Sequence, residues 1–175
     1  MGRVITSICG TVIACAGLVA FSAPVLAADA AAGRDKAAIE ALEARFAAAF
    51  NARDVKAIMS LYQPGPGLFV FDVTPPRQHV GWADYQADWE ATFKTTPAVF
   101  HFSISDLSVT VVGPVAYGHS IQSEVFTRAN GSKGAFAVRV TDVYRKLHGR
   151  WLIVQEHVSV PVDLDTGKAD VLSRP

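Results

Sequence analysis

Apolar positions recur along the chain with two different periods, and the period changes near residue 97. From residue 35 to residue 95 they recur every three or four residues, which is the spacing of an amphipathic helix. Beyond residue 97 they alternate with polar positions, which is the spacing of a strand with two different faces. The pattern predicts the order helix, helix, short strand, helix and then four strands.

Three helices are predicted, each with one apolar stripe. Asp35 is suited to cap the first and Asp54 the second, because a short side-chain oxygen accepts a hydrogen bond from a free N–H group of the first turn. The prolines and glycines of residues 63–67 end the second helix. The third stripe, which follows Gly81, either anchors its helix in the core or forms an aromatic wall against a ligand, and the two roles are compatible. The stripes are Ile39, Leu42, Phe46 and Phe50, then Val55, Ile58, Met59 and Tyr62, then Trp82, Tyr85, Trp89 and Phe93.

The strands are predicted to form one bent sheet. A short strand over residues 68–71 ends at Asp72 and is followed by a stiff polar connection, and four long strands follow later in the chain. The connections between the long strands are short, so the strands are expected to be antiparallel neighbours. In the first of them the apolar phase shifts near Ser105 and Asp106, which predicts a bulge. The long strands are predicted over residues 99–112, 115–127, 135–146 and 150–160. Three helices on one face of such a sheet make an α+β fold.

The last strand divides its residues between two faces, since successive side chains point to opposite sides. One face begins apolar and ends polar, which is expected where a strand leaves the core and enters a pocket. It consists of Trp151, Ile153, Gln155, His157 and Ser159. The other face is apolar except for Glu156, so we expect it to be covered by another part of the chain or by a partner. It consists of Leu152, Val154, Glu156, Val158 and Val160.

The N-terminus has the pattern of an export signal. Arg3 precedes an uncharged run over residues 4–26, and Ala27 is the small residue expected at a cleavage site. A retained membrane anchor is the first alternative, and a lipid anchor on Cys15 within a lipobox-like segment is the second. We therefore expect a periplasmic or secreted protein with no membrane contact after cleavage. The chain is predicted to divide into a signal peptide (1–27), a mobile lead-in (28–34), an α+β domain (35–161) and a C-terminal tail (162–175).

Composition narrows the classes of function. The chain has 16 Lys and Arg against 16 Asp and Glu, with no basic cluster, which speaks against a nucleic-acid partner. Both cysteines, Cys9 and Cys15, lie in the predicted leader, so the mature chain offers no disulfide and no thiol nucleophile. The five histidines show no helical pairing at metal-ligand spacing. Neither a metal nor a cofactor is expected.

Two segments carry a resemblance to a known family. The helix opening over residues 81–85 and the ending over residues 149–161, in this order of elements, resemble the SnoaL-like group of the nuclear transport factor 2-like superfamily, which includes ketosteroid isomerase. The resemblance covers residues 36–169 and implies a cystatin-like cone and a homodimer formed through the open face of the sheet. The family ending reads His-Glu-His-x-Ser-x-Pro, and Gln155 stands at the position of its first histidine. This substitution removes one titratable group.

The resemblance also suggests where chemistry takes place. Ketosteroid isomerase uses an aspartate base together with a tyrosine and a protonated aspartic acid. Asp72, Tyr85, Asp88 and His157 match these groups in type, but not position by position, so the roles are not transferred. The catalytic candidates are His157 and Asp72. Histidine is a common acid or base near neutral pH, so His157 is either an acid or base at the pocket floor or a core histidine bonded to a neighbour.

A ligand pocket is predicted between the third helix and the last two strands. Aromatic side chains of the helix form one wall, and polar side chains of the strands orient the ligand. Arg139 is either paired with a buried carboxylate, with Glu156, Asp72 and Asp142 as candidates, or aimed at an anionic ligand. The ligand-binding candidates are Trp82, Tyr85, Trp89, Arg139, Thr141 and Gln155.

The resulting hypothesis is an exported, dimeric SnoaL-like protein that binds a small, largely apolar molecule. Acid–base chemistry of the isomerase, cyclase or hydratase type would accompany binding. The alternative is a ligand-binding or accessory module without turnover, because one fold can host both. A carboxylate or histidine with a shifted pKa inside a closed apolar pocket would favour the enzyme.

Overall fold

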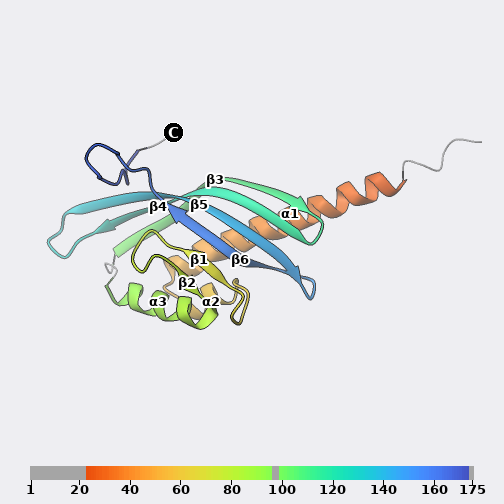
Figure 1. The fold of residues 1–175 in the computed structure, drawn as a ribbon, viewed down its shortest axis with the longest axis horizontal. Helices are drawn as coiled ribbons and strands as arrows, with labels where there is room; N and C mark the ends of the chain where they lie inside the picture. Colours follow the sequence, from red (N-terminus) through yellow and green to blue (C-terminus); the bar gives the residue numbers. More distant parts are fainter. Residues whose placement is uncertain (1–22, 96–98, 174–175) are drawn as a thin grey trace, which may run out of the picture.

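The computed structural model describes residues 23–95 and 99–173 and confirms the predicted α+β fold. Three helices lie on one side of a strongly curved sheet (Figure 1). The helices are α1 (Ala23–Asn51), α2 (Val55–Met59) and α3 (Trp82–Thr95). The strands are β1 (Phe69–Phe71), β2 (His79–Val80), β3 (Val99–Val112), β4 (Val115–Thr127), β5 (Lys133–Leu147) and β6 (Arg150–Ser159).

The sheet has six strands in the order β2-β1-β6-β5-β4-β3. The four long strands form the predicted antiparallel meander. The short strand β1 pairs in parallel with β6, and Phe71 lies opposite His157. Residues 79 and 80, expected in a polar connection, instead form β2, an antiparallel edge strand beside β1. This arrangement brings the end of β1 and its following loop next to the C-terminal half of β6.

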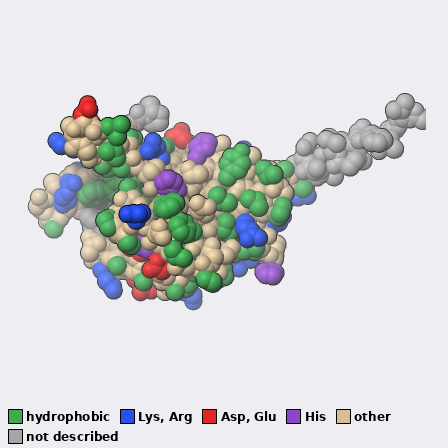
Figure 2. Space-filling model, viewed as in Figure 1, with side chains coloured by type: hydrophobic (Ala, Val, Ile, Leu, Met, Phe, Trp, Pro, Cys, Tyr) green, Lys and Arg blue, Asp and Glu red, His purple; other side chains and the backbone are tan. Residues whose placement is uncertain are grey.

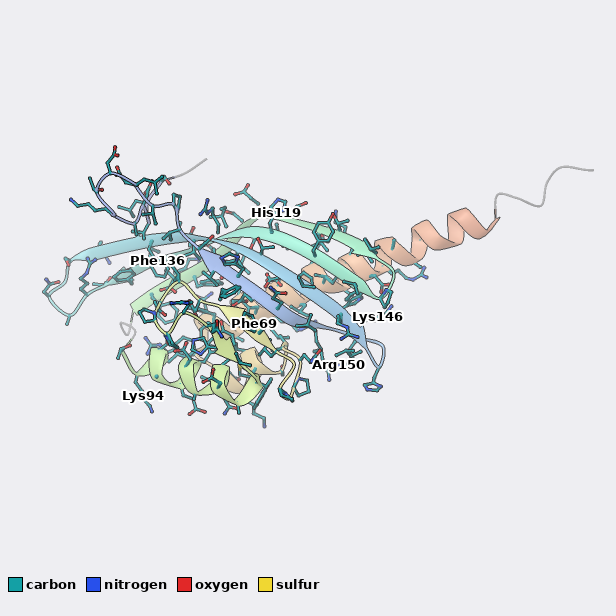
Figure 3. The ribbon with its side chains drawn as sticks, in the orientation of Figure 1. Phe69, Lys94, His119, Phe136, Lys146 and Arg150 are labelled. Carbon is teal, nitrogen blue, oxygen red and sulfur yellow. The ribbon has the colours of Figure 1, made fainter. Side chains whose placement is uncertain are left out.

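Helix α1 begins earlier than predicted. It runs without interruption from Ala23, so residues 28–34 are helical and not a separate lead-in, which the high helix propensity of alanine explains. Asp35 therefore lies within the helix, where its carboxylate accepts hydrogen bonds from Lys146 Nζ at 2.6 Å and from Trp151 Nε1 at 3.0 Å. Lys146 lies on β5 (Figure 3). The predicted leader, up to residue 22, lies outside the described residues. Among the described helices, none has the length and apolar content needed to cross a membrane.

The helical stripes form the core as predicted. Ile39, Leu42, Phe46 and Phe50 of α1 are buried against α2, α3 and the inner face of the sheet. Asp54 caps α2, since its Oδ1 accepts a hydrogen bond from the N–H group of Ala57 at 2.9 Å. The aromatic rings of α1 and α3 pack edge to face, which places the main core of the cone between these two helices and β3.

Two bulges set the faces of the long strands. The predicted one is confirmed, because the register of β3 with β4 shifts between Ser105 and Ser108, and Asp106 adopts a φ of 53°. The second was not predicted: Val143 pairs with Gln155 but Tyr144 pairs with Ile153, which leaves Val154 of β6 as the extra residue.

The second bulge reverses the faces of β6. Trp151 and Ile153 face the core on one side of the bulge, and Glu156 faces it on the other. Gln155 and His157 consequently point to the outer face of the sheet and are exposed. The prediction that these two share a face with Trp151 and Ile153 is wrong, because strict alternation does not persist through a bulge.

Candidate functional site

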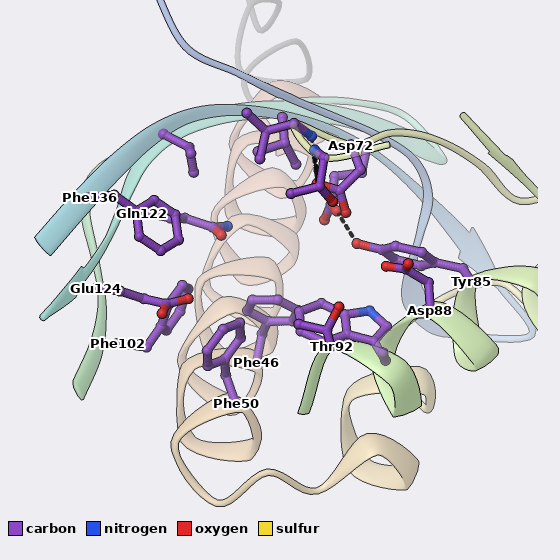
Figure 4. A pocket seen from close by; sticks show the side chains of 16 residues that line it. Phe46, Phe50, Asp72, Tyr85, Asp88, Thr92, Phe102, Gln122, Glu124 and Phe136 are labelled. Carbon is purple, nitrogen blue, oxygen red and sulfur yellow. Dashed lines mark hydrogen bonds between the residues drawn. The ribbon is translucent and has the colours of Figure 1, made fainter. Parts of the chain in front are cut away.

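A cavity of about 140 Å³ opens between α1, α3 and the inner face of the sheet (Figure 4). Its walls are mainly aromatic and come from α1, α3, β3 and β5. The aromatic wall consists of Phe46, Phe50, Trp89, Phe102 and Phe136. Its polar lining comes from the end of β1, from α3 and from the inner faces of β4 and β6. The polar groups include Asp72, Tyr85, Asp88, Gln122, Glu124 and Glu156. Apolar walls with a few converging polar atoms are typical of small-molecule sites.

Glu156 is the polar centre of the site. The Tyr62 hydroxyl donates a hydrogen bond to its Oε2 at 2.7 Å, and the Tyr85 hydroxyl donates one to its Oε1 at 2.8 Å. The side chain is 4% exposed. Burial raises the pKa of Glu156 to about 7, and the tyrosine hydrogen bonds counteract part of that rise. Burial, followed by the nearby charge of Glu156, raises the pKa of both tyrosines well above the usual range.

Two further buried carboxyl groups lie behind Glu156. The Tyr144 hydroxyl donates a hydrogen bond to Glu43 Oε1 at 2.9 Å and lies 3.4 Å from Asp142 Oδ2. Burial raises the pKa of Glu43 to about 7. Burial, together with the charges of Glu156 and Glu43, raises the pKa of Asp142. Within the described residues no Lys, Arg or His forms an ion pair with these three groups, so the interior favours their protonated forms.

Asp72 lies where β1 ends and faces the same cavity as Glu156. Its Oδ1 accepts hydrogen bonds from the backbone N–H groups of Val73 and Thr74. Burial raises the pKa of Asp72, and the neighbouring Asp88 carboxylate adds to the rise, whereas the two backbone hydrogen bonds and His79 oppose it. A carboxylate of this kind accepts a proton near neutral pH more readily than an ordinary aspartate does.

His79 on β2 is buried beside the site. Its Nδ1 lies 3.4 Å from Asp84 Oδ2 and its Nε2 lies 3.8 Å from Asp88 Oδ2. Neither ring nitrogen forms a hydrogen bond with a described residue. Asp72, His79 and Asp88 each offer a donor atom, all within 4.8 Å of one another, so this set could hold a cation. A tetrahedral zinc ion needs donors roughly 3.3–3.6 Å apart, so the set would have to contract.

The structure brings together three of the predicted site residues. Asp72, Tyr85 and Trp89 line the cavity. Trp82 does not, because its Nε1 donates a hydrogen bond to the carbonyl of Met59 at 2.8 Å and holds α3 against α2. Its part in the fold is that of a core anchor, one of the two roles that the stripe allowed.

The other four predicted residues lie on the outer face of the sheet. Arg139, Thr141, Gln155 and His157 are all exposed. Thr141 lies opposite His157 in the β5–β6 pair, and the His157 ring packs against Phe71 with centroids 5.4 Å apart. The prediction that these four side chains line the pocket is therefore wrong, and the second bulge is the physical reason for Gln155 and His157. None of the three carboxyl groups suggested as partners of Arg139 forms an ion pair with it among the described residues.

Sequence reasoning missed several groups that the structure places in or beside the cavity. The sequence suggests Glu156 only as a partner for Arg139, although it is the one polar residue on an otherwise apolar strand face. Glu43 directly follows Leu42 of the apolar stripe, and that position was a signal that it is buried. Gln122 and Glu124 alternate with outward-facing residues of β4, and the sequence alone does not tell which of the two alternating sets faces the cavity.

Comparisons with known proteins agree with this geometry. The family model of the SnoaL-like domain matches residues 39–163. The chain is similar to a nuclear transport factor 2-like protein of unknown function from Pseudomonas putida, with 26% identity, a TM-score of 0.73, and coverage of 84% of this chain and 98% of that chain. No functionally curated protein matches the chain.

Two further similar structures have names that suggest a reaction. One is a proposed dehydratase of the nuclear transport factor 2-like family from Streptomyces avermitilis, with 16% identity, a TM-score of 0.63, and coverage of 73% of this chain and 97% of that chain. The other is a proposed scytalone dehydratase from Novosphingobium aromaticivorans, with 15% identity, a TM-score of 0.63, and coverage of 73% and 85%. At these identities the similarity is one of fold.

Proposed function

The chain belongs to the family of SnoaL-like domains, and we propose that it binds a small, largely apolar molecule in the cone and converts it by acid–base chemistry. The reaction class is isomerisation, cyclisation or the addition or removal of water. Isomerisation, cyclisation and the removal of water each need a base that takes a proton from carbon and an acid that supplies one to oxygen or carbon, and the addition of water is the reverse of its removal.

One observation carries this proposal: two kinds of carboxyl group face the same apolar cavity in different surroundings. Asp72 follows the end of β1 and accepts backbone hydrogen bonds, whereas Glu156 is buried and accepts hydrogen bonds from two tyrosine hydroxyls. Acid–base sites typically contain two neighbouring acids whose different surroundings give them different tendencies to hold a proton.

The two groups suggest a division of roles. The Asp72 carboxylate would accept a proton from a carbon next to a ligand carbonyl. Glu156, protonated below its pKa of about 7, and the adjoining Tyr85 hydroxyl would stabilise the negative charge that develops on the ligand oxygen. Asp72 would then return its proton to another carbon of the ligand, so no atom is gained or lost in an isomerisation.

The test uses cyclohex-3-enone, a single-ring ketone whose isomerisation to the conjugated enone is followed by ultraviolet absorption. We expect the wild-type protein to accelerate the reaction above buffer, and Asp72→Asn to lower the rate by roughly 10²–10⁴-fold, the usual contribution of a general base. Glu90→Gln, which changes an exposed carboxylate of α3 outside the cavity, is the control and should change the rate little.

If NMR shows that the ketone binds in the cavity but the wild-type protein does not accelerate the reaction above buffer, the protein is a binding module and not an enzyme for this reaction. An unchanged rate for Asp72→Asn would remove Asp72 from the chemistry.

A further inference from the structure

The charged groups that line the cavity all have the same sign. They are the carboxyl groups of Asp72, Asp88, Glu124 and Glu156, and no Lys, Arg or His is among the lining residues that the structure describes. A ligand with a carboxylate or phosphate group would meet four carboxyl groups, which either repel it when ionised or offer it no positive charge when protonated. The site therefore disfavours anions.

Two of these four acids accept hydrogen bonds in the protein, and a third lies beside a histidine ring. Glu156 accepts hydrogen bonds from two tyrosines. Asp72 accepts backbone hydrogen bonds, and Asp88 lies beside His79. Glu124 forms no hydrogen bond or ion pair with any described residue, which leaves its carboxyl group available to a ligand.

Glu124 lies in an aromatic setting. Its neighbours across the sheet are Phe102 on β3 and Phe136 on β5, and all three side chains point into the cavity (Figure 4). Burial alone raises the pKa of Glu124 to about 7. A carboxylate in such surroundings has lost part of its hydration, and a ligand cation would compensate this loss with a charge-assisted hydrogen bond.

The polar groups of the cavity thus form two separate sets. Asp72, Tyr85 and Asp88 lie at one end, and Glu124 lies across the aromatic floor from them (Figure 4). Phe46 and Phe50 of α1 lie between the two sets. A ligand that spans the cavity would place one polar group at each end and an apolar ring between them.

We propose that the cavity binds a small aromatic amine, with its ring against the phenylalanine and tryptophan walls and its ammonium group on the Glu124 carboxylate. This inference rests on the proposed small-molecule function and adds the class of ligand. A phenyl face attracts a cation, so Phe102 and Phe136 support the same choice. The volume of about 140 Å³ is close to that of cavities of roughly 150 Å³ that bind benzene, which sets the size at one ring with short substituents.

Three probes of the same size and different charge test the proposal. They are 4-fluorobenzylamine, 4-fluorobenzyl alcohol and 4-fluorobenzoate, followed by fluorine NMR and calorimetry at about pH 8, where Glu124 is ionised. We expect the amine to bind about 10–100-fold more tightly than the alcohol, as a charge-assisted hydrogen bond implies. The benzoate should show no binding at the concentrations that saturate the amine.

A pair of glutamine variants assigns the effect to one residue. Glu124→Gln should reduce the affinity of the amine to that of the alcohol and leave the alcohol unchanged. Glu90→Gln, at an exposed position of α3 outside the cavity, should leave all three affinities unchanged. A folded Glu124→Gln protein that keeps the full preference for the amine would overturn the proposal.

The probes also separate this inference from the proposed function. Equal binding of the amine and the alcohol would refute the amine preference while leaving a small-molecule pocket in place. Tightest binding of the benzoate would refute it as well. If none of the three binds, the small-molecule function fails together with the inference.

Discussion

At the scale of single residues, Glu156 connects the core with the pocket. It lines the cavity, accepts hydrogen bonds from Tyr62 and Tyr85, and lies next to the buried Asp142. The two tyrosines are fully buried, so their hydroxyl groups have no solvent to replace a lost partner. The residue is therefore important for stability as well as for the proposed chemistry.

We expect Glu156→Ala to lower the free energy of unfolding by roughly 2–5 kcal/mol, because two buried hydroxyl donors lose their acceptor. Glu156→Gln keeps one acceptor oxygen, and its NH₂ group can donate to the hydroxyl of the other tyrosine, so it should cost less than about 1 kcal/mol. Urea denaturation followed by tryptophan fluorescence measures both changes. The exposed Glu90→Ala is the control, and a cost for Glu156→Ala as small as that of the control would contradict this account.

Residue identity predicted only part of the site. Asp72, Tyr85 and Trp89 were found because they close a strand or belong to an aromatic stripe, and both signals are local. Glu156 and Glu124 were missed because a carboxyl group inside an apolar face carries no local signal of its partners. The hydroxyl donors of Glu156 come from residues 94 and 71 positions earlier in the chain.

At the scale of elements, the two bulges show why one register was predictable and the other was not. In β3 the apolar residues change parity near Asp106, so the shift is visible in the sequence. In β6 the residues from Trp151 to Val154 are all apolar, and either parity satisfies the core. The position of Val154 as the extra residue follows from pairing with β5, which hydrophobicity alone does not encode.

Asn51 at the end of helix α1 forms hydrogen bonds with the edge strand β3. Asn51 Nδ2 donates hydrogen bonds to the carbonyls of Phe102 and Ala47, each at 2.9 Å, and its Oδ1 accepts one from the Phe102 N–H group at 2.8 Å. These bonds continue the edge of the sheet onto the end of the helix. They also position the Phe102 ring, which stacks on Phe50 in the wall of the cavity.

We expect Asn51→Ala to lower the free energy of unfolding by roughly 1–3 kcal/mol, because two hydrogen bonds to Phe102 are lost. The Phe102 amide should then exchange its hydrogen faster than the other amides of β3, which NMR hydrogen exchange resolves. Gln78→Ala, at an exposed position of the loop before β2, serves as the control. Unchanged exchange at Phe102 would show that the edge strand does not depend on Asn51.

At the scale of the whole molecule, the outer face of the sheet is open and partly apolar. Tyr117 and Val125 are each 53% exposed there, and His119 projects from the same face (Figure 3). Figure 2 shows hydrophobic side chains beside histidines on the visible surface. The homodimer expected from the family resemblance would cover such a face. We propose it on that ground, and sedimentation of the mature protein at micromolar concentration tests it.

Export remains a prediction that the intact mass of protein recovered from the periplasm would test.

The buried acids also determine how the stability of the whole molecule depends on pH. Glu43 and Glu156 have pKa values of about 7 in the folded protein, raised from 4.5, mainly by burial. Since the folded state binds these protons more tightly than the unfolded state does, its advantage is complete below about pH 4.5 and is lost as the pH rises through about 7. Asp35 has a lowered pKa, so its contribution changes only at more acidic pH.

We therefore expect the free energy of unfolding to fall between about pH 5 and about pH 8, by on the order of a few kcal/mol, since each proton held only by the folded state contributes roughly 1.4 kcal/mol per pH unit. Urea denaturation across this range measures the slope. Glu43→Gln should flatten it because it removes one of the titrating groups while keeping an acceptor for the Tyr144 hydroxyl. Glu40→Gln, at an exposed position one turn earlier on α1, should leave the slope unchanged. A wild-type stability that rises from pH 5 to pH 8 would mean that Glu43 and Glu156 are ionised in the folded interior. Glu156, the acid of the proposed reaction, would then have no proton to donate.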